Sequence, residues 1–272
     1  MLTWDESISQ IEASQGSPTI RSGVRWFWIR RLPVVVTGFS GAGKTELWRH
    51  LTLKPAEDRI SSGPDEGYYF RAKKRSTLAL ITIPGQLSNK STILSDKYMD
   101  RSAKVHGVIF VASFGYNFIW PGLQAEAVAS SLRPYSLPSL TKRNKDQELD
   151  SFNEICTFIS EKWSRSPKVN RPKWLLILCN KIDLYWDETD AAHKYYRLGS
   201  GDFGRAAAPL VEKLAGGGFR YHVLPIAIQP RNYLFDSTNG SFKRESTLSE
   251  AQGDASMNLL VDTLEELCGP QQ

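Results

Sequence analysis

Residues 34–45 have the sequence Val-Val-Val-Thr-Gly-Phe-Ser-Gly-Ala-Gly-Lys-Thr, and the rest of the chain is arranged around them. The three β-branched residues at 34–36 predict a buried strand of a parallel sheet, because both faces of such a strand are covered. The Gly-x-x-x-x-Gly-Lys-Thr pattern that follows is typical of a phosphate-binding loop, or P-loop. A glycine-rich turn between a strand and a helix is the alternative. The strand before the pattern and the helical residues 46–51 after it favour the P-loop.

The residues of this loop suit an anionic ligand. Gly38, Gly41 and Gly43 lack the Cβ atoms that would keep the backbone from wrapping around a phosphate, and they can adopt positive φ. Successive backbone N–H groups and the N-terminus of the next helix would face the anion. We expect Lys44 to reach the β- and γ-phosphates and Thr45 to ligate Mg²⁺.

The composition limits the class of protein. A chain of 272 residues allows one large domain or two small ones. A hydrophobic fraction of 41%, with 12 Phe, 10 Tyr and 8 Trp, is enough for a large core. The net charge of +5 is modest for this length, so it does not argue for nucleic acid, and no nucleic-acid partner is predicted.

Cysteine usage and hydropathy bear on the compartment. Cys156, Cys179 and Cys268 are far apart and form no C-x-x-C motif, which predicts buried free thiols in a reducing compartment. The four histidines lack metal-ligand spacing. No apolar run approaches the roughly 20 residues of a membrane span, and the N-terminus lacks the apolar core of a secretory signal. We therefore expect a cytoplasmic protein.

Apolar strands and amphipathic helices alternate from the P-loop onward. Further strands are predicted at 67–74, 77–83, 105–114, 174–179 and 221–228, and helices at 2–11, 46–51, 149–163, 203–214 and 257–267. The first two of these strands are joined by a short polar break, which predicts an antiparallel hairpin. The pattern predicts an α/β fold with a mostly parallel sheet, helices on both faces, and ligands at the carboxyl ends of the strands.

Residues 1–31 are predicted to be an N-terminal extension, and residues 32–272 the main domain with a surface insertion at 115–143. The sequence Asn-Lys-Asp-Gln at 144–147 resembles a capping box and predicts that a helix begins there. Segment 21–31 interleaves Arg with Trp and Phe, which favours an extra edge strand. The alternative for this segment is weak peripheral contact with an anionic membrane surface, or with a partner protein.

Two further motifs follow apolar strands: Pro84-Gly85-Gln86 and Asn180-Lys181-Ile182-Asp183. Alone, each is also compatible with a polar turn. In this order behind a P-loop, they resemble the motifs of the Ras-like GTPases of the P-loop NTPase class, over residues 32–268. The resemblance implies the three-layer P-loop NTPase fold, GTP and GDP as ligands, and Mg²⁺ as cofactor.

The resemblance also implies a role for each motif. The carboxylate of Asp183 would accept from guanine N1–H and the exocyclic amine, a donor pair that adenine lacks. Asn180 would orient the base and the stem of Lys181 would lie over it. Gln86 would position the attacking water, and the Gly85 N–H would meet the γ-phosphate. The predicted nucleotide-binding residues are Gly38, Ser40, Gly41, Ala42, Gly43, Lys44, Thr45, Gly85, Asn180, Lys181, Asp183 and Ala227; Gln86 and Lys44 are the predicted catalytic residues, and Thr45 and Ser62 the predicted metal ligands.

The chain departs from the family pattern in several places. Thr82 stands where the family has an aspartate that holds Mg²⁺ through water, so weak metal affinity or weak hydrolysis is expected. Ser62, or its neighbour Ser61, stands about where the family has its metal-sensing threonine. Arg59, three residues before Ser62, has the spacing of the built-in arginine finger of G-protein α subunits, and a solvated arginine is the alternative. In the loop after the last strand only Ala227 matches, and its backbone is predicted to meet guanine O6.

The main functional hypothesis is a GTP-binding protein that hydrolyses GTP slowly and switches its contact with an unidentified effector protein. Loss of the γ-phosphate would then release the loops around 57–66 and 85–97. The second hypothesis is a pseudo-GTPase, a nucleotide-binding structural or assembly module with little turnover, which Thr82 favours. A third, an ATP-dependent kinase or ATPase, depends on the P-loop alone.

Overall fold

The computed structural model describes residues 2–14, 30–52, 65–72, 76–82, 105–164 and 166–268. The strands are β1 (Arg30–Gly38), β2 (Asp65–Ala72), β3 (Ser76–Thr82), β4 (Gly107–Ala112), β5 (Trp174–Cys179), β6 (Arg220–Pro225), β7 (Tyr233–Ser237) and β8 (Gly240–Arg244). The α-helices are α1 (Trp4–Ala13), α2 (Lys44–Thr52), α4 (Leu123–Ser131), α5 (Leu137–Ser164), α6 (Thr189–Tyr196), α7 (Asp202–Ala215) and α8 (Glu250–Cys268). Short 3₁₀ helices lie at Lys168–Asn170, Ile182–Leu184 and Trp186–Glu188.

Six of the strands form one sheet in the order β2-β3-β1-β4-β5-β6. Neighbouring pairs from β3 to β6 are parallel, and β2 pairs antiparallel with β3. Strand β1 lies in the middle, between β3 and β4, so the P-loop that follows it is at the centre of the carboxyl edge of the sheet. This is the edge at which ligands bind in open α/β sheets.

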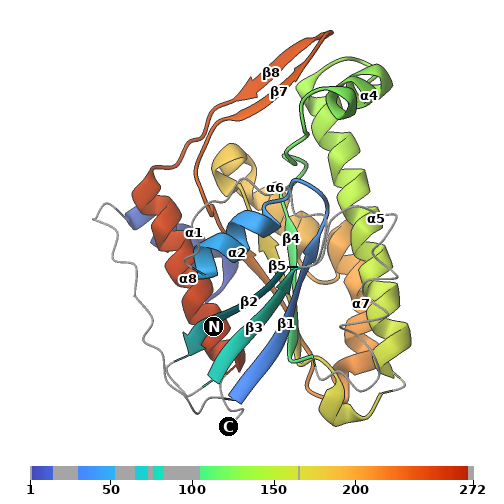
Figure 1. Cartoon of the computed structure of the whole chain (residues 1–272), viewed down its shortest axis with the longest axis vertical. Helices are drawn as coiled ribbons and strands as arrows, with labels where there is room; N and C mark the ends of the chain where they lie inside the picture. Colours follow the sequence, from blue (N-terminus) through green and yellow to red (C-terminus); the bar gives the residue numbers. More distant parts are fainter. Residues whose placement is uncertain are drawn as a thin grey trace.

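Alternate residues of the central strands point to opposite faces and enter two cores. On one face, Val35, Phe110 and Ile177 pack with α5 and α7, around Phe152 and Phe203. Figure 1 shows α5 and α7 together on this side of the sheet and α2 and α8 on the other.

The second core lies on the opposite face, where Val34, Val36 and Ile109 pack with Leu47 of α2 and Leu260 of α8. Since helices cover both faces, the predicted three-layer α/β P-loop NTPase fold is confirmed, including the antiparallel hairpin of β2 and β3.

The helix predicted to begin at residue 144 begins seven residues earlier. Pro138 is the second residue of α5, where a missing N–H costs nothing, and the Ser136 hydroxyl accepts from the Ser139 N–H at 3.3 Å. Asn144 is therefore not a cap. It is buried in the helix, and its Nδ2 donates to the Gly115 carbonyl at 2.9 Å.

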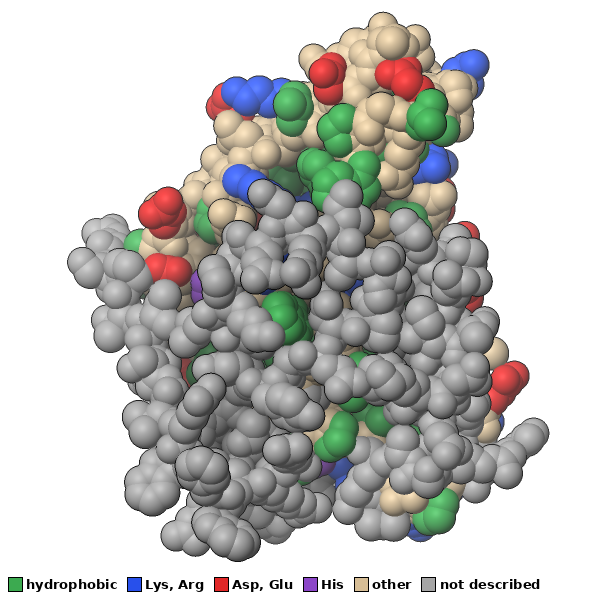
Figure 2. Space-filling view, viewed as in Figure 1, with side chains coloured by type: hydrophobic (Ala, Val, Ile, Leu, Met, Phe, Trp, Pro, Cys, Tyr) green, Lys and Arg blue, Asp and Glu red, His purple; other side chains and the backbone are tan. Residues whose placement is uncertain are grey.

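The antiparallel pair β7–β8 and helix α4 project together beyond the carboxyl edge of the sheet (Figure 1). Glu126 of α4 accepts hydrogen bonds from the backbone N–H and the hydroxyl of Thr238, at 2.9 and 2.6 Å. On this projection, apolar side chains are exposed among charged ones (Figure 2). The exposed fractions are 92% for Leu123 and 57% for Leu234.

Predictions about the cysteines, membrane spans and the N-terminal segment can be compared with the described residues. Cys156, Cys179 and Cys268 are free and buried, as expected. No helix formed by the described residues is both long and apolar enough to cross a membrane. Arg30 and Arg31 open the central strand β1, whereas residues 21–29 of the predicted edge strand lie outside the described residues.

Candidate nucleotide-binding site

The P-loop connects β1 to α2, and its glycines are held in conformations that other residues rarely adopt. Gly38, Gly41 and Gly43 have φ of 142°, 74° and 105°. A Cβ on Gly41 would overlap the carbonyl oxygen of Phe118, and one on Gly43 would overlap Nδ2 of Asn180. These glycines therefore serve both the turn and its close approach to neighbouring segments.

Lys44, the first residue of α2, lies folded over the loop. Its Nζ donates to the carbonyls of Gly38 and Phe39, at 3.0 and 2.8 Å, and its side chain is buried. The neighbouring Thr45 is exposed at the helix N-terminus. An ammonium and a hydroxyl are thus placed beside the free N–H groups of a helix end, an arrangement suited to a phosphate with its bound cation.

A segment from the end of β4 (residues 113–119) crosses the outside of the P-loop. The Phe118 N–H donates to the Gly41 carbonyl at 2.9 Å, and Nδ2 of Asn117 donates to the Ser40 carbonyl at 3.3 Å. Asn117 Nδ2 also donates to Oε1 of Glu148 at 2.9 Å, and the same oxygen accepts from the backbone N–H of Ser113 at 2.7 Å. Burial raises the pKa of the Glu148 carboxyl. Glu148 on α5 therefore anchors the segment that supports the loop.

Asn180 follows β5 and joins three parts of the site. Its Nδ2 donates to the Ala42 carbonyl of the P-loop at 2.8 Å, and its Oδ1 accepts from the Ile228 N–H at 3.2 Å. The side chain is buried. The end of β5, the P-loop and the loop after β6 are thus held at fixed distances from one another.

Lys181 has a left-handed backbone, with φ of 62°. Its Nζ donates to the carbonyls of Gly41 and Tyr116, at 2.9 and 2.6 Å. Burial lowers the pKa of this amine to about 7, and the charge of Arg231 acts in the same direction. Because the amine is occupied by backbone carbonyls, the hydrocarbon stem of Lys181 lines the pocket described below.

Asp183 lies in the short 3₁₀ helix after Lys181 and is 1% exposed. Its Oδ2 accepts from the Arg231 backbone N–H at 3.2 Å, whereas Oδ1 is buried without a partner among the described residues. Burial raises the pKa of this carboxyl. A buried acceptor without a donor costs free energy, about 1–3 kcal/mol for an ordinary polar group, so this oxygen is suited to a ligand that brings an N–H.

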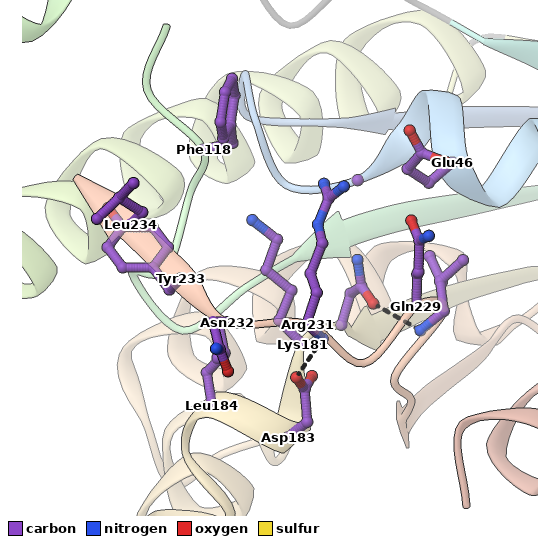
Figure 3. A pocket seen from close by; sticks show the side chains of 13 residues that line it. Glu46, Phe118, Lys181, Asp183, Leu184, Gln229, Arg231, Asn232, Tyr233 and Leu234 are labelled. Carbon is purple, nitrogen blue, oxygen red and sulfur yellow. Dashed lines mark hydrogen bonds between the residues drawn. The ribbon is translucent and has the colours of Figure 1, made fainter. Parts of the chain in front are cut away.

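Asn180, Lys181 and Asp183 line a pocket of about 220 Å³ (Figure 3). It extends from the P-loop and first turn of α2 to the motif after β5 and the loop from β6 to β7. The lining residues are Gly43, Glu46, Phe118, Asn180, Lys181, Asp183, Leu184, Ile228, Gln229, Arg231, Asn232, Tyr233 and Leu234. The structure therefore brings the predicted residues Gly43, Asn180, Lys181 and Asp183 together.

The role predicted for Ala227, a backbone contact with guanine O6, stays a prediction. Ala227 is fully buried and does not line the pocket, and its N–H donates to the Ser256 hydroxyl of α8 at 2.9 Å. The pocket-lining residues begin one position later, and after Ile228, whose N–H is bonded to Asn180, comes Gln229.

Several predicted site residues are not placed. Gly85, Gln86, Ser62, Ser61 and Arg59 lie outside the described residues, so their roles stay predictions.

Thr82 is placed at the carboxyl end of β3, opposite Val36 of β1. It is 6% exposed, and its hydroxyl has no partner among the described residues. Nor do the described residues contain a group of three or more His, Cys, Asp or Glu that could hold a metal ion. For Mg²⁺ the described part of the site thus offers the hydroxyls of Thr45 and Thr82.

Sequence reasoning missed Arg231 and the two residues that hold segment 113–119, Asn117 and Glu148. A lone Asn, Glu or Arg outside a motif carries no local signal. For Glu148 a hint existed, because a carboxylate among the apolar positions of a core helix is seldom buried without partners.

No protein-family model matches the sequence, and no curated protein matches it. Among solved structures, the chain is similar to one of the mammalian SRP receptor, with 17% identity over 87% of this chain and 100% of that chain and a TM-score of 0.45. It is also similar to the bacterial selenocysteine-specific elongation factor EF-Sec, with 12% identity over 88% of this chain and 29% of that chain and a TM-score of 0.41. At these identities and TM-scores, what the chain does must be inferred from its own site residues.

Proposed function

We propose that this protein binds guanine nucleotides and hydrolyses GTP to GDP and phosphate. The observation that carries the proposal is the carboxylate of Asp183, which is buried at one end of the pocket that begins at the P-loop and has one oxygen without a donor among the described residues. Guanine offers N1–H and an exocyclic N–H at one edge, which a carboxylate can accept as a pair. Adenine has no such pair, so the pocket favours guanine.

The other described residues have parts in the same arrangement. The stem of Lys181 covers one face of the base, and Asn180 fixes the distance from the base to the P-loop. Lys44 would exchange its bonds to the loop carbonyls for bonds to phosphate oxygens, and Thr45 would ligate Mg²⁺. When bound, Mg²⁺ would offset the charge of the β- and γ-phosphate oxygens. Hydrolysis further requires Gln86 to orient the attacking water, as the family resemblance implies.

The switch, partner and localisation hypotheses belong to the same proposal. Segments 57–66 and 85–97 would contact the γ-phosphate and release on hydrolysis, and an effector protein would distinguish the two states. The protein would act in the cytoplasm, with weak peripheral membrane contact through residues 21–31. Co-sedimentation with anionic liposomes, compared between the wild type and a chain in which Arg25, Arg30 and Arg31 are replaced by Ser, tests the membrane contact.

A substitution that should shift the preference from guanine to xanthine nucleotides tests the contact between Asp183 and the base. Asp183→Asn replaces an acceptor by a group that can donate, so GDP affinity should fall by about 30-fold or more, from the loss of charged hydrogen bonds worth about 1.5–3 kcal/mol each. Affinity for xanthosine diphosphate, which has a carbonyl at position 2, should rise. Asp187→Asn is the matched control, because Asp187 is exposed and outside the pocket. Equal GDP affinity in the wild type and Asp183→Asn contradicts the base contact.

Multiple-turnover phosphate release tests the hydrolysis step separately. Wild-type release above background that is lost in Gln86→Ala supports the GTPase. Equal background rates in both would leave a nucleotide-binding protein without turnover.

A further inference from the structure

Arg231 lines the nucleotide pocket and belongs to none of the motifs. Its backbone N–H donates to Oδ2 of Asp183 at 3.2 Å, so its Cα is fixed beside the carboxylate proposed to hold the base edge. The side chain itself is exposed. The Cα end of the Arg231 side chain is thus held in place through the backbone, while the exposed guanidinium can move to follow a ligand.

Figure 3 shows the side chains of Arg231 and Lys181 rising side by side from the floor of the pocket at Asp183 toward the P-loop. In this view the guanidinium of Arg231 points toward the side of the pocket that Glu46 lines. The two long side chains therefore border the space between the carboxylate and the P-loop, which is where a base would lie.

The two cations differ in what they present to this space. The ammonium of Lys181 is held by the Gly41 and Tyr116 carbonyls, which leaves its apolar stem as a wall. Two acids line the pocket: Asp183 accepts from the Arg231 backbone, and Glu46 pairs with Arg49 at 3.1 Å. The charge of Arg231 lowers the pKa of Lys181, which shows that the two cations are close enough to repel. An electron-rich ring between them would reduce this repulsion.

The two aromatic side chains that line the pocket make contacts with other parts of the protein. Tyr233 is buried, and its hydroxyl donates to the Asn117 carbonyl at 3.2 Å. Phe118 packs edge-on against Trp120, with ring centroids 5.0 Å apart. Among the described residues of the pocket, Arg231 is a planar cation with an exposed side chain, so it is able to swing onto a base.

We propose that the guanidinium of Arg231 stacks on the outer face of the guanine base, opposite the stem of Lys181, and closes the base pocket. This inference rests on the proposed function. An arginine suits the position because its guanidinium is planar, weakly hydrated and stacks on aromatic faces. A stacked guanidinium would exclude water from the base and slow nucleotide release.

The test compares the wild type with Arg231→Ala, Arg231→Lys and the control Arg205→Ala, an exposed arginine on α7. Affinities for guanosine, GMP and GDP are measured by competition with a fluorescent GDP analogue. Arg231→Ala should weaken all three by the same factor, about fivefold to tenfold, as a cation–π contact of about 1 kcal/mol implies. Arg231→Lys should recover less than half of the loss, because an ammonium cannot stack as a plane. Arg205→Ala should change nothing.

Three results would overturn the proposal: no loss in Arg231→Ala, a loss confined to the phosphorylated ligands, or full recovery in Arg231→Lys. The last two would indicate a phosphate contact instead. Misfolding should not confound the comparison, because the hydrogen bond to Asp183 comes from the backbone N–H of residue 231 and is kept in every variant. Thermal melts verify that the variants are folded. A wild type that binds no GDP would contradict the proposed function, whereas GDP binding unaffected by Arg231→Ala would contradict this inference alone.

Discussion

Two lysines of the site, the buried Lys44 and the half-buried Lys181, make the same kind of bond with different consequences. Lys44 donates to carbonyls five and six residues before it, within its own loop. Lys181 donates to Gly41 and Tyr116, which are 140 and 65 residues away in the chain. Bonds within one loop can be exchanged for a ligand without moving other elements, whereas bonds between distant segments hold the fold together. We infer that Lys44 serves the phosphate, and that Lys181 holds the site together and covers the base.

The largest expected effect is that of Lys44→Met on phosphate binding. Loss of the ammonium removes charge-assisted hydrogen bonds to the β- and γ-phosphates, so GTP affinity should fall about 100-fold while the melting temperature changes little. Calorimetric titration with GTP and a thermal melt measure the two quantities. A variant that melts far below the wild type would contradict the separation of the two lysines.

Lys181→Met should have the opposite profile. The carbonyls of Gly41 and Tyr116 lose their donor, so the free energy of unfolding should fall by about 2–3 kcal/mol, and GDP affinity should fall only about tenfold. Urea denaturation gives the first value and titration the second. Lys243→Met is the control, because Lys243 is exposed and pairs only locally, with Glu245. An unchanged free energy of unfolding in Lys181→Met would contradict the inference that Lys181 holds distant segments of the fold together.

The smallest expected effect concerns pH. Burial, with the charge of Arg231, lowers the pKa of Lys181 to about 7 from an ordinary value of 10.5. Between these values the unfolded chain binds more protons than the folded chain, so stability rises with pH across this window and is lost as pH falls toward 7. The difference in unfolding free energy between wild type and Lys181→Met should therefore grow from about pH 7 to about pH 9. A difference that shrinks over this range would show that the charged amine is favoured in the fold.

The sheet could be predicted because its strands are apolar runs bounded by polar residues. Strand β5 has the predicted bounds, and Asn180 to Asp183 follow it as expected, because a motif that ends a buried strand must lie at the carboxyl edge. The hairpin of β7 and β8 gave no such signal. Its strands are only five residues each; β7 alternates buried with exposed side chains, whereas β8 has no buried side chain.

The limits of the sequence-based prediction have local physical causes. Pro138 resembled a loop residue, yet the first turn of a helix tolerates proline. Ala227 is the single residue that matches a three-residue motif of the family. One matching residue is too little to fix the register of a loop. Arg231 could not be predicted at all, because its place in the pocket depends on a backbone hydrogen bond to a residue 48 positions earlier.

The most direct test of guanine-nucleotide binding is a calorimetric comparison of GDP and ADP, each with and without Mg²⁺. With Mg²⁺ present, we predict that GDP binds at least about 100-fold more tightly than ADP, because Asp183 gains two charge-assisted hydrogen bonds from guanine alone. We also predict that removal of Mg²⁺ changes GDP affinity only modestly, because Thr82 supplies no carboxylate beside the metal. Equal affinities for GDP and ADP would contradict the account.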